Sequence, residues 1–187
     1  MSPQPGVQVT RSKSLTTTPT HTEGLLAFES SLRDVATFAH ADEARSDVVH
    51  HITITGVVDI ATWTLSDVTP HAYVLPYEDC GTAMARVIHL SGLSIGRGYR
   101  AAVLELMGRT RGCTHFMSLS LELAQLHTLG TYTTLRTKMP DGDRTRPEWL
   151  ASEPQLENAC YSLRSDSPVI QQSIAVRRQH EGPGSGA

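Results

Sequence analysis

The feature that most constrains the fold is a change in hydrophobic period at Pro76. Before this residue, three runs rich in β-branched and aromatic residues lie at about 50–57, 60–67 and 71–75, separated by Gly, Asp and Pro. After it, apolar residues recur about every 3.6 positions, which predicts helices. We therefore expect an α+β protein in which an antiparallel β-meander of three or more strands is followed by three helices packed on one face.

The expected helices have recognisable ends. They run from Asp79 to just before Gly92, from about 97 to 107, and from near Gly112 onward. With these boundaries, Cys80 and Cys113 each fall in the first turn of a helix.

Length and composition favour a single domain. The chain has 187 residues and 39% apolar content, enough for one buried core. We expect this domain to span 23–175, with 1–22 as a flexible N-terminal segment or an edge strand and 176–187 as a disordered tail. The segment 25–38 is interpreted as a strand, and 167–176 as a last strand.

Charge and hydropathy exclude several partners. The net charge is -3 and the basic residues are scattered, so neither nucleic acid nor an anionic membrane is an expected partner. No apolar run approaches the roughly 18 residues of a membrane span, and the first twenty residues lack the apolar stretch of a signal peptide. We therefore expect a cytoplasmic protein. The sequence is compatible with a homodimer.

Cysteine and histidine are the residues with the clearest chemical potential. Three cysteines, Cys80, Cys113 and Cys160, make a disulfide framework unfavourable and leave metal-binding, catalytic or simply buried thiols. A helix start stabilises thiolate over thiol. His50 shares a strand face with apolar residues, and with His115 it could complete a set of nitrogen and sulfur donors of the kind zinc takes.

Other side chains could take part only if folding brings them near the cysteines. His115 projects about 200° away from Cys113 if both lie on one helix, so it is expected to contact substrate unless the helix starts after it. Asp34 and Glu29 are either solvated strand residues or general acids or bases. Four arginines between the cysteine helices could hold a carboxylate or phosphate, or form a solvated face: Arg97, Arg100, Arg109 and Arg111.

The order of motifs resembles a bacterial family of proteins of unknown function, whose signature is a Gly-Cys-Thr-His-Leu segment opening a helix. The matching segments are "LLAFESSLRD" at 25–34, "HHITITGVVD" at 50–59, "PYEDC" at 76–80, "LSGLSIGRGYRAAV" at 90–103, "RGCTHF" at 111–116 and "CYSLRSD" at 160–166. The chain departs from the pattern at Tyr161, where the family has His, and at Thr55, where Arg is usual.

A more distant resemblance, to the NifU-type iron–sulfur scaffold, implies a NifU/SufE-like core. That fold also runs a three-stranded meander, a helix-start cysteine, a further helix and another helix-start cysteine. Cys80 and Cys113 match these cysteines, and His50 falls where the scaffold has an acidic ligand; the scaffold's earlier cysteine has no counterpart here. The resemblance therefore implies a His50, Cys80, Cys113 set with one open position, as in catalytic zinc sites.

These observations lead to one main hypothesis and three alternatives. The main one is a zinc enzyme of lyase or hydrolase type, acting on a small organic substrate with metal ligands His50, Cys80 and Cys113, while Cys113 and His115 contribute to catalysis. The alternatives are a non-catalytic metal or iron–sulfur carrier that docks a partner protein, a metal-free enzyme with Cys113 as nucleophile, and a structural domain with inert cysteines.

Overall fold

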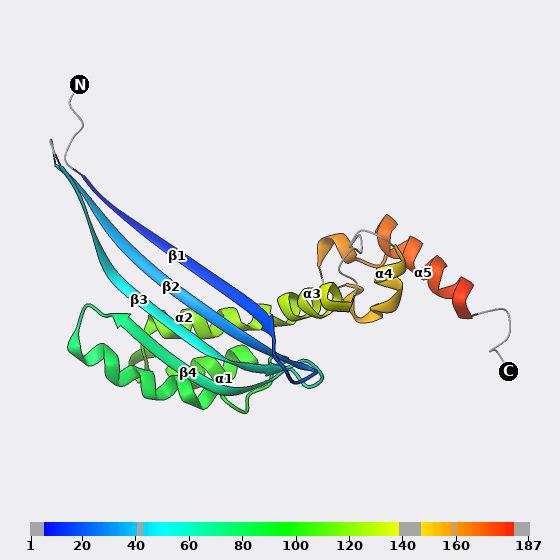
Figure 1. The fold of residues 1–187 in the computed structure, drawn as a ribbon, viewed down its shortest axis with the longest axis horizontal. Coiled ribbons are helices and arrows are strands. Elements are labelled where there is room, and N and C mark those ends of the chain that lie inside the picture. Colours follow the sequence, from blue (N-terminus) through cyan, green and yellow to red (C-terminus); the bar gives the residue numbers. More distant parts are fainter. Residues whose placement is uncertain (1–5, 41–42, 139–146, 159, 182–187) are drawn as a thin grey trace, which may run out of the picture. The chain divides into compact units, whose positions relative to one another are not determined.

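Four long antiparallel strands form the N-terminal part of the chain. In the computed structural model, which describes residues 6–40, 43–138, 147–158 and 160–181, they are β1 (Gly6–Pro19), β2 (Leu25–His40), β3 (Glu43–Asp59) and β4 (Thr64–Val74). They lie in the sheet in chain order, each antiparallel to the next (Figure 1). Helices follow the sheet, so the α+β prediction is confirmed.

The strand boundaries differ from the sequence-based prediction: the run predicted at 50–57 is part of β3, which already begins at Glu43. Residues 64–67 and 71–74 of the runs predicted at 60–67 and 71–75 lie in one strand, β4, which contains Pro70 opposite Ile54, while residues 60–63 form a turn. Proline lacks the N–H that a central strand needs, but β4 is the last strand of this sheet, where a missing donor can face outward. Proline therefore interrupts the sequence pattern without ending the strand.

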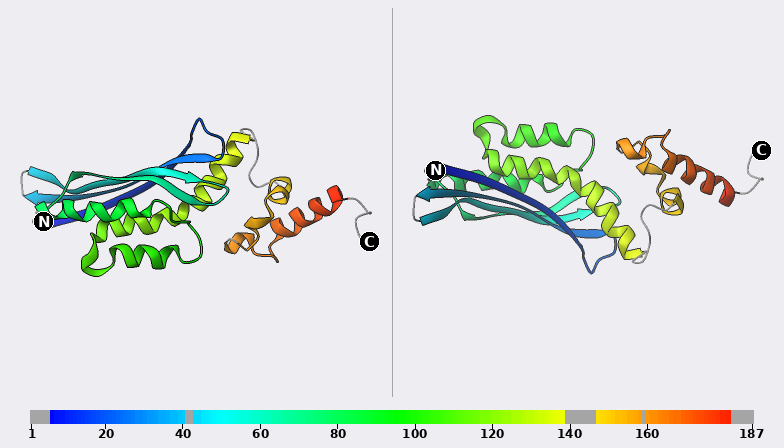
Figure 2. Two further views of the ribbon diagram at one scale, coloured as in Figure 1. Left: turned by 90° about the horizontal axis from the view of Figure 1, so that it is seen from below. Right: turned by 90° about the horizontal axis from the view of Figure 1, so that it is seen from above.

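One face of the sheet carries the core. Alternate residues of β2 and β3, such as Leu32 and Ile52, are fully buried, as is Leu65 of β4. Against them pack the 3-10 helix η1 (Glu78–Leu90) and helices α1 (Tyr99–Met107) and α2 (Thr114–Glu122), which Figure 2 shows on a single side of the sheet. The short segments η2 (Arg109–Arg111) and η3 (Leu123–Gln125) precede and follow α2, and α3 (Leu126–Lys138) comes next.

The C-terminal part of the chain is helical. It contains α4 (Pro147–Ser152), η4 (Pro154–Leu156), η5 (Tyr161–Leu163) and α5 (Pro168–Glu181). The strand predicted at 167–176 is wrong, because this segment lies in α5. Ser167 and Pro168 are the signal that the prediction missed: the Ser167 hydroxyl accepts a hydrogen bond from the Ile170 amide at 3.4 Å, and Pro168 suits the first helical position.

Contacts between residues divide the chain into two compact units, residues 1–135 and 136–187. We expected one domain at 23–175, between a segment 1–22 that is flexible or an edge strand and a disordered tail at 176–187. Residues 6–19 form strand β1, and α5 continues to Glu181; residues 182–187 lie outside the described part of the chain. No helix among the described residues is both long and apolar enough to cross a membrane.

Candidate functional site

The cysteines and histidines predicted as metal ligands or catalytic residues line one pocket in the first unit. The pocket has a volume of about 870 Å³, and His50 of β3, Cys80 of η1, Cys113 and His115 all contribute to its wall. Folding therefore brings together side chains from three separate segments of the sequence. Cys160 is exposed and does not line this pocket.

A register shift between β2 and β3 lies directly beside this pocket. Asp34 pairs with His50, whereas the next residue, Val35, pairs with Val48, so Val49 is left over as a β-bulge. Bulges re-aim neighbouring side chains and are frequent next to active sites. Val49 itself lines the pocket, and the Asp34 and His50 side chains meet on the face of the sheet that α2 covers.

Asp34 is a buried carboxylate held by two partners. Arg11 of β1 donates from Nε to Oδ1 and from a terminal nitrogen to Oδ2, both at 2.7 Å, and His50 Nδ1 lies 2.9 Å from Oδ2. The hydrogen bonds from Arg11 hold the pKa of Asp34 below its ordinary value against the opposing effect of burial, and His50 adds to the lowering. Asp34 is therefore ionised, and His50 Nδ1 donates to it.

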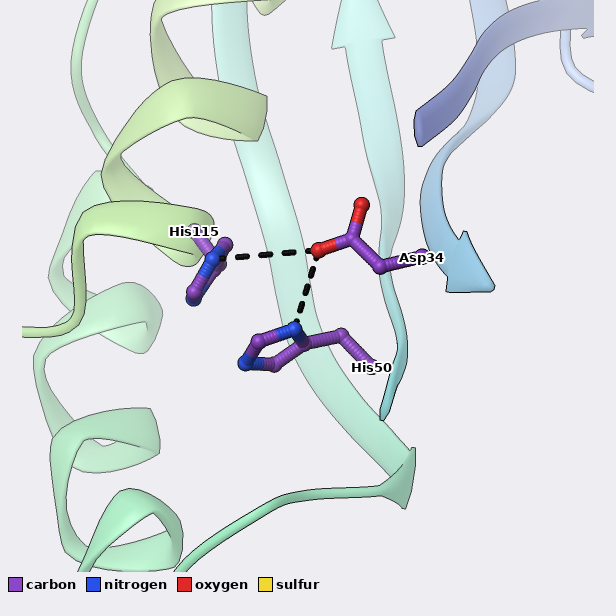
Figure 3. A group of neighbouring side chains, drawn as sticks. All are labelled: Asp34, His50 and His115. Carbon is purple, nitrogen blue, oxygen red and sulfur yellow. Dashed lines mark hydrogen bonds and ion pairs between the residues drawn. The ribbon is translucent and has the colours of Figure 1, made fainter. Parts of the chain in front are cut away.

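His115 completes this group from the first turn of α2. Its Nε2 lies 3.9 Å from Asp34 Oδ2, and its ring lies over that of His50 with 3.8 Å between the ring centres (Figure 3). On its other side, Nδ1 lies 3.6 Å from Cys113 Sγ. Burial lowers the pKa of His115, and electrostatic interactions with His50 and Arg11 lower it further against the opposing effect of Asp34, which favours the neutral imidazole.

The contact between Cys113 and His115 corrects the expectation that these side chains diverge. Cys113 is the residue before α2 and has extended backbone angles (φ -83°, ψ 131°), so the helical rotation of about 100° per residue does not apply between it and His115. No side chain caps this end of α2. Both side chains can therefore turn toward the same pocket.

Two sets of metal donors overlap at His50. Within the described part of the chain, the close group of possible ligands is Asp34, His50 and His115, whose ligand atoms lie within 4.8 Å of one another (Figure 3). Cys80 and Cys113 are not in that group, although both line the pocket. Asp34 does not line the pocket, and Arg11 already occupies both of its oxygens. Geometry thus favours Asp34 as a partner that orients His50, whose Nε2 remains available.

Sequence reasoning considered Asp34 only conditionally and did not consider Arg11. One signal could have identified Asp34: it shares its strand parity with Leu26, Phe28 and Leu32, and this alternation places a carboxylate on the core face of β2, where a charge needs a partner. Of the four arginines considered, Arg111 lines the pocket; Arg97, Arg100 and Arg109 do not, whereas Arg86, which was not considered, does.

The first unit is thus an antiparallel sheet covered by helices, with a pocket whose wall presents imidazole and thiol groups. Residues 9–128 match the model of a family described as protein of unknown function (DUF2889), and the chain belongs to this family. The match includes Arg11, Asp34, His50 and every residue that lines the pocket. No curated protein and no solved structure matches the chain.

Proposed function

We propose that this protein is a metal-dependent enzyme acting on a small organic substrate, with one divalent ion, in first place zinc, bound by His50, Cys80 and Cys113. The observation that carries the proposal is the convergence of these nitrogen and sulfur donors, from three segments of the chain, on one pocket of about 870 Å³. Imidazole and thiolate are typical zinc ligands, and three protein ligands leave a coordination position open for substrate or water.

The contact between Asp34 and His50 supports this proposal. Metal-binding histidines usually donate their other ring N–H to a carboxylate or carbonyl, which fixes the tautomer and the direction of the ligand nitrogen. Asp34 Oδ2 accepts such a bond from His50 Nδ1 at 2.9 Å, and Arg11 keeps the carboxylate ionised and in place. His50 Nε2 is thereby left as the ring nitrogen that could bind a metal ion.

The reaction class follows from this donor set. A bound zinc ion would polarise a carbonyl or hydroxyl group or lower the pKa of a bound water. His115 lies on the same wall, and its neutral imidazole can accept a proton. This chemistry suits a lyase or a hydrolase, and the resemblance to the NifU-type scaffold, which also uses helix-start cysteines, is part of the same proposal.

Metal titration tests the proposal. Chelator-treated, reduced protein is expected to bind one zinc ion per chain, and cobalt(II) in its place is expected to give the thiolate-to-metal charge-transfer band of a cysteine-ligated site. Absence of stoichiometric binding, or cobalt binding without that band, would contradict the proposal. Brown protein containing iron and sulfide after purification without air would replace the enzyme proposal with the carrier alternative.

A second candidate, a metal-free thiol enzyme, is favoured by one specific contact. Cys113 Sγ lies 3.6 Å from His115 Nδ1, and His115 Nε2 lies 3.9 Å from Asp34 Oδ2, so that thiol, imidazole and carboxylate follow one another in space. This is the order in which an activated nucleophile, its base and the group that orients the base are arranged in cysteine and serine hydrolases.

Alkylation rates separate the two candidates. For the thiol enzyme, iodoacetamide is expected to modify half-buried Cys113 at least about tenfold faster than exposed Cys160 in metal-free protein, because His115 would accept the thiol proton as the sulfur attacks. A His115→Gln substitution should abolish this advantage. The rates are measured by peptide mass spectrometry, with Cys160 as the internal control. Slower alkylation of Cys113 than of Cys160 in metal-free protein contradicts the thiol enzyme, whereas protection of Cys80 and Cys113 by zinc supports the metal centre.

A further inference from the structure

We propose that the substrate of this pocket carries an oxyanion group, a carboxylate or a phosphate, and that Arg86 and Arg111 bind it. This inference rests on the proposed function, since it names the substrate class of the same site. It is carried by the charges on the wall of the pocket. Apart from the two histidines, the ionisable groups there that carry charge at neutral pH are Arg86, Arg111 and Asp79, so positive charge predominates.

Arg111 is held in position by the helix that precedes it. Its terminal nitrogen donates to the carbonyl of Leu104, in the last turn of α1, at 3.1 Å. A guanidinium group has five N–H donors, so this bond leaves donors free for an anion while limiting the motion of the side chain. A cation near the C-terminal end of a helix is also stabilised by the helix dipole.

Arg86 extends from η1 and has no hydrogen bond or ion pair within the described part of the chain. It therefore has its full set of donors available. Arginine binds carboxylate and phosphate groups through two parallel N–H···O bonds, which gives direction as well as attraction. Two such side chains on one concave wall are a binding arrangement that a single solvated arginine does not provide.

The remaining features of the pocket agree with a small anion. Its volume of about 870 Å³ lies within the range of roughly 300–1,000 Å³ typical of small-molecule sites. Cys113 and Thr114, at the N-terminal end of α2, form part of the wall, and the first turn of this helix has no acidic side chain. The positive end of the helix dipole thus adds to the charge of the arginines. Asp79 is the acidic residue of the wall and would repel a poorly placed anion.

Binding of a simple dicarboxylate tests this inference. Succinate is added at constant ionic strength to the chain, both zinc-loaded and metal-free with the chelator removed, and binding is measured by saturation-transfer NMR. Wild-type protein is expected to bind succinate but not neutral succinamide. Arg86→Gln and Arg111→Gln should each weaken binding at least about tenfold, since a charge-assisted contact is lost. Arg97→Gln, an exposed arginine outside the pocket, is the matched control and should leave binding unchanged.

The outcomes separate this inference from the proposed function. No succinate binding to wild type, equal binding to all variants, or equal binding of succinamide would overturn the inference, and the two arginines would then be a solvated surface. Binding to metal-free protein through both arginines would uphold it even if the metal titration failed. Displacement of succinate by inorganic phosphate would support a phosphate-bearing substrate, and resistance to displacement a carboxylate.

Discussion

A Cys113→Ser substitution is expected to lower the zinc affinity of the chain by more than about 100-fold. The free energy of zinc binding at structural sites is about 10–16 kcal/mol. One of several ligands therefore contributes about 3 kcal/mol, which corresponds to a factor of more than 100 in the dissociation constant. A serine hydroxyl is a poor substitute for a thiolate. Cys80→Ser and His50→Ala should have effects of the same size. Competition with a zinc-binding dye measures each affinity.

The controls for this prediction distinguish the two donor sets. Cys160→Ser should bind zinc like the wild type, because Cys160 is exposed and does not line the pocket. Asp34→Asn should weaken zinc binding by about 10- to 100-fold, the usual cost of removing a group that orients a ligand. If Cys80→Ser and Cys113→Ser bound zinc normally while Asp34→Asn did not bind it at all, the ligands would instead be Asp34, His50 and His115.

A Phe116→Ala substitution is expected to destabilise the first unit by about 3–5 kcal/mol, because it removes a large, fully buried side chain and leaves a cavity. Phe116 is the residue after His115, and it fastens the start of α2 to the core of the sheet. The variant should therefore also bind zinc less tightly than wild type at the same temperature, since the position of His115 and Cys113 depends on that start.

Urea unfolding followed by circular dichroism measures the change in stability, with a separate transition fitted for each unit if two are seen. Leu104→Ala is the control, because Leu104 is an exposed leucine of α1, and the substitution should lower the free energy of unfolding by less than about 1 kcal/mol. If Phe116→Ala lowered the free energy of unfolding no more than Leu104→Ala does, then Phe116 would not hold α2 against the sheet.

The hydrophobic period was sufficient to predict the class of the fold. Alternation through Ile52 and Ile54 requires a strand with one buried face, and the spacing of apolar residues after Pro76 requires helices. Where a local signal was ambiguous, the prediction was wrong: a short apolar run such as 167–176 suits a strand or a helix, and only the cap at Ser167 and Pro168 favours the helix.

The candidate site was only partly predictable for a different reason. Cys80, Cys113, His50 and His115 can be selected as chemically capable residues because their types, and the places of the two cysteines at helix starts, are visible in the sequence. Their convergence on one pocket is not visible, because it depends on how the helices pack against the sheet. Cys113 and His115 show this limit. Their side chains were predicted to point apart, but α2 begins at Thr114, one residue after Cys113, and the two side chains are in contact.

The sequence by itself determined the fold class, the change from strands to helices after Pro76, and the presence of cysteines at two helix starts, because local periodicity and capping govern all of these. Only the tertiary structure decided that Arg11, Asp34 and His50 form one hydrogen-bonded group. These residues are 23 and 16 positions apart, and they meet through the register of three strands and the bulge at Val49. Strand register depends on pairing between distant segments, and a shift of one residue would move each side chain to the opposite face of the sheet.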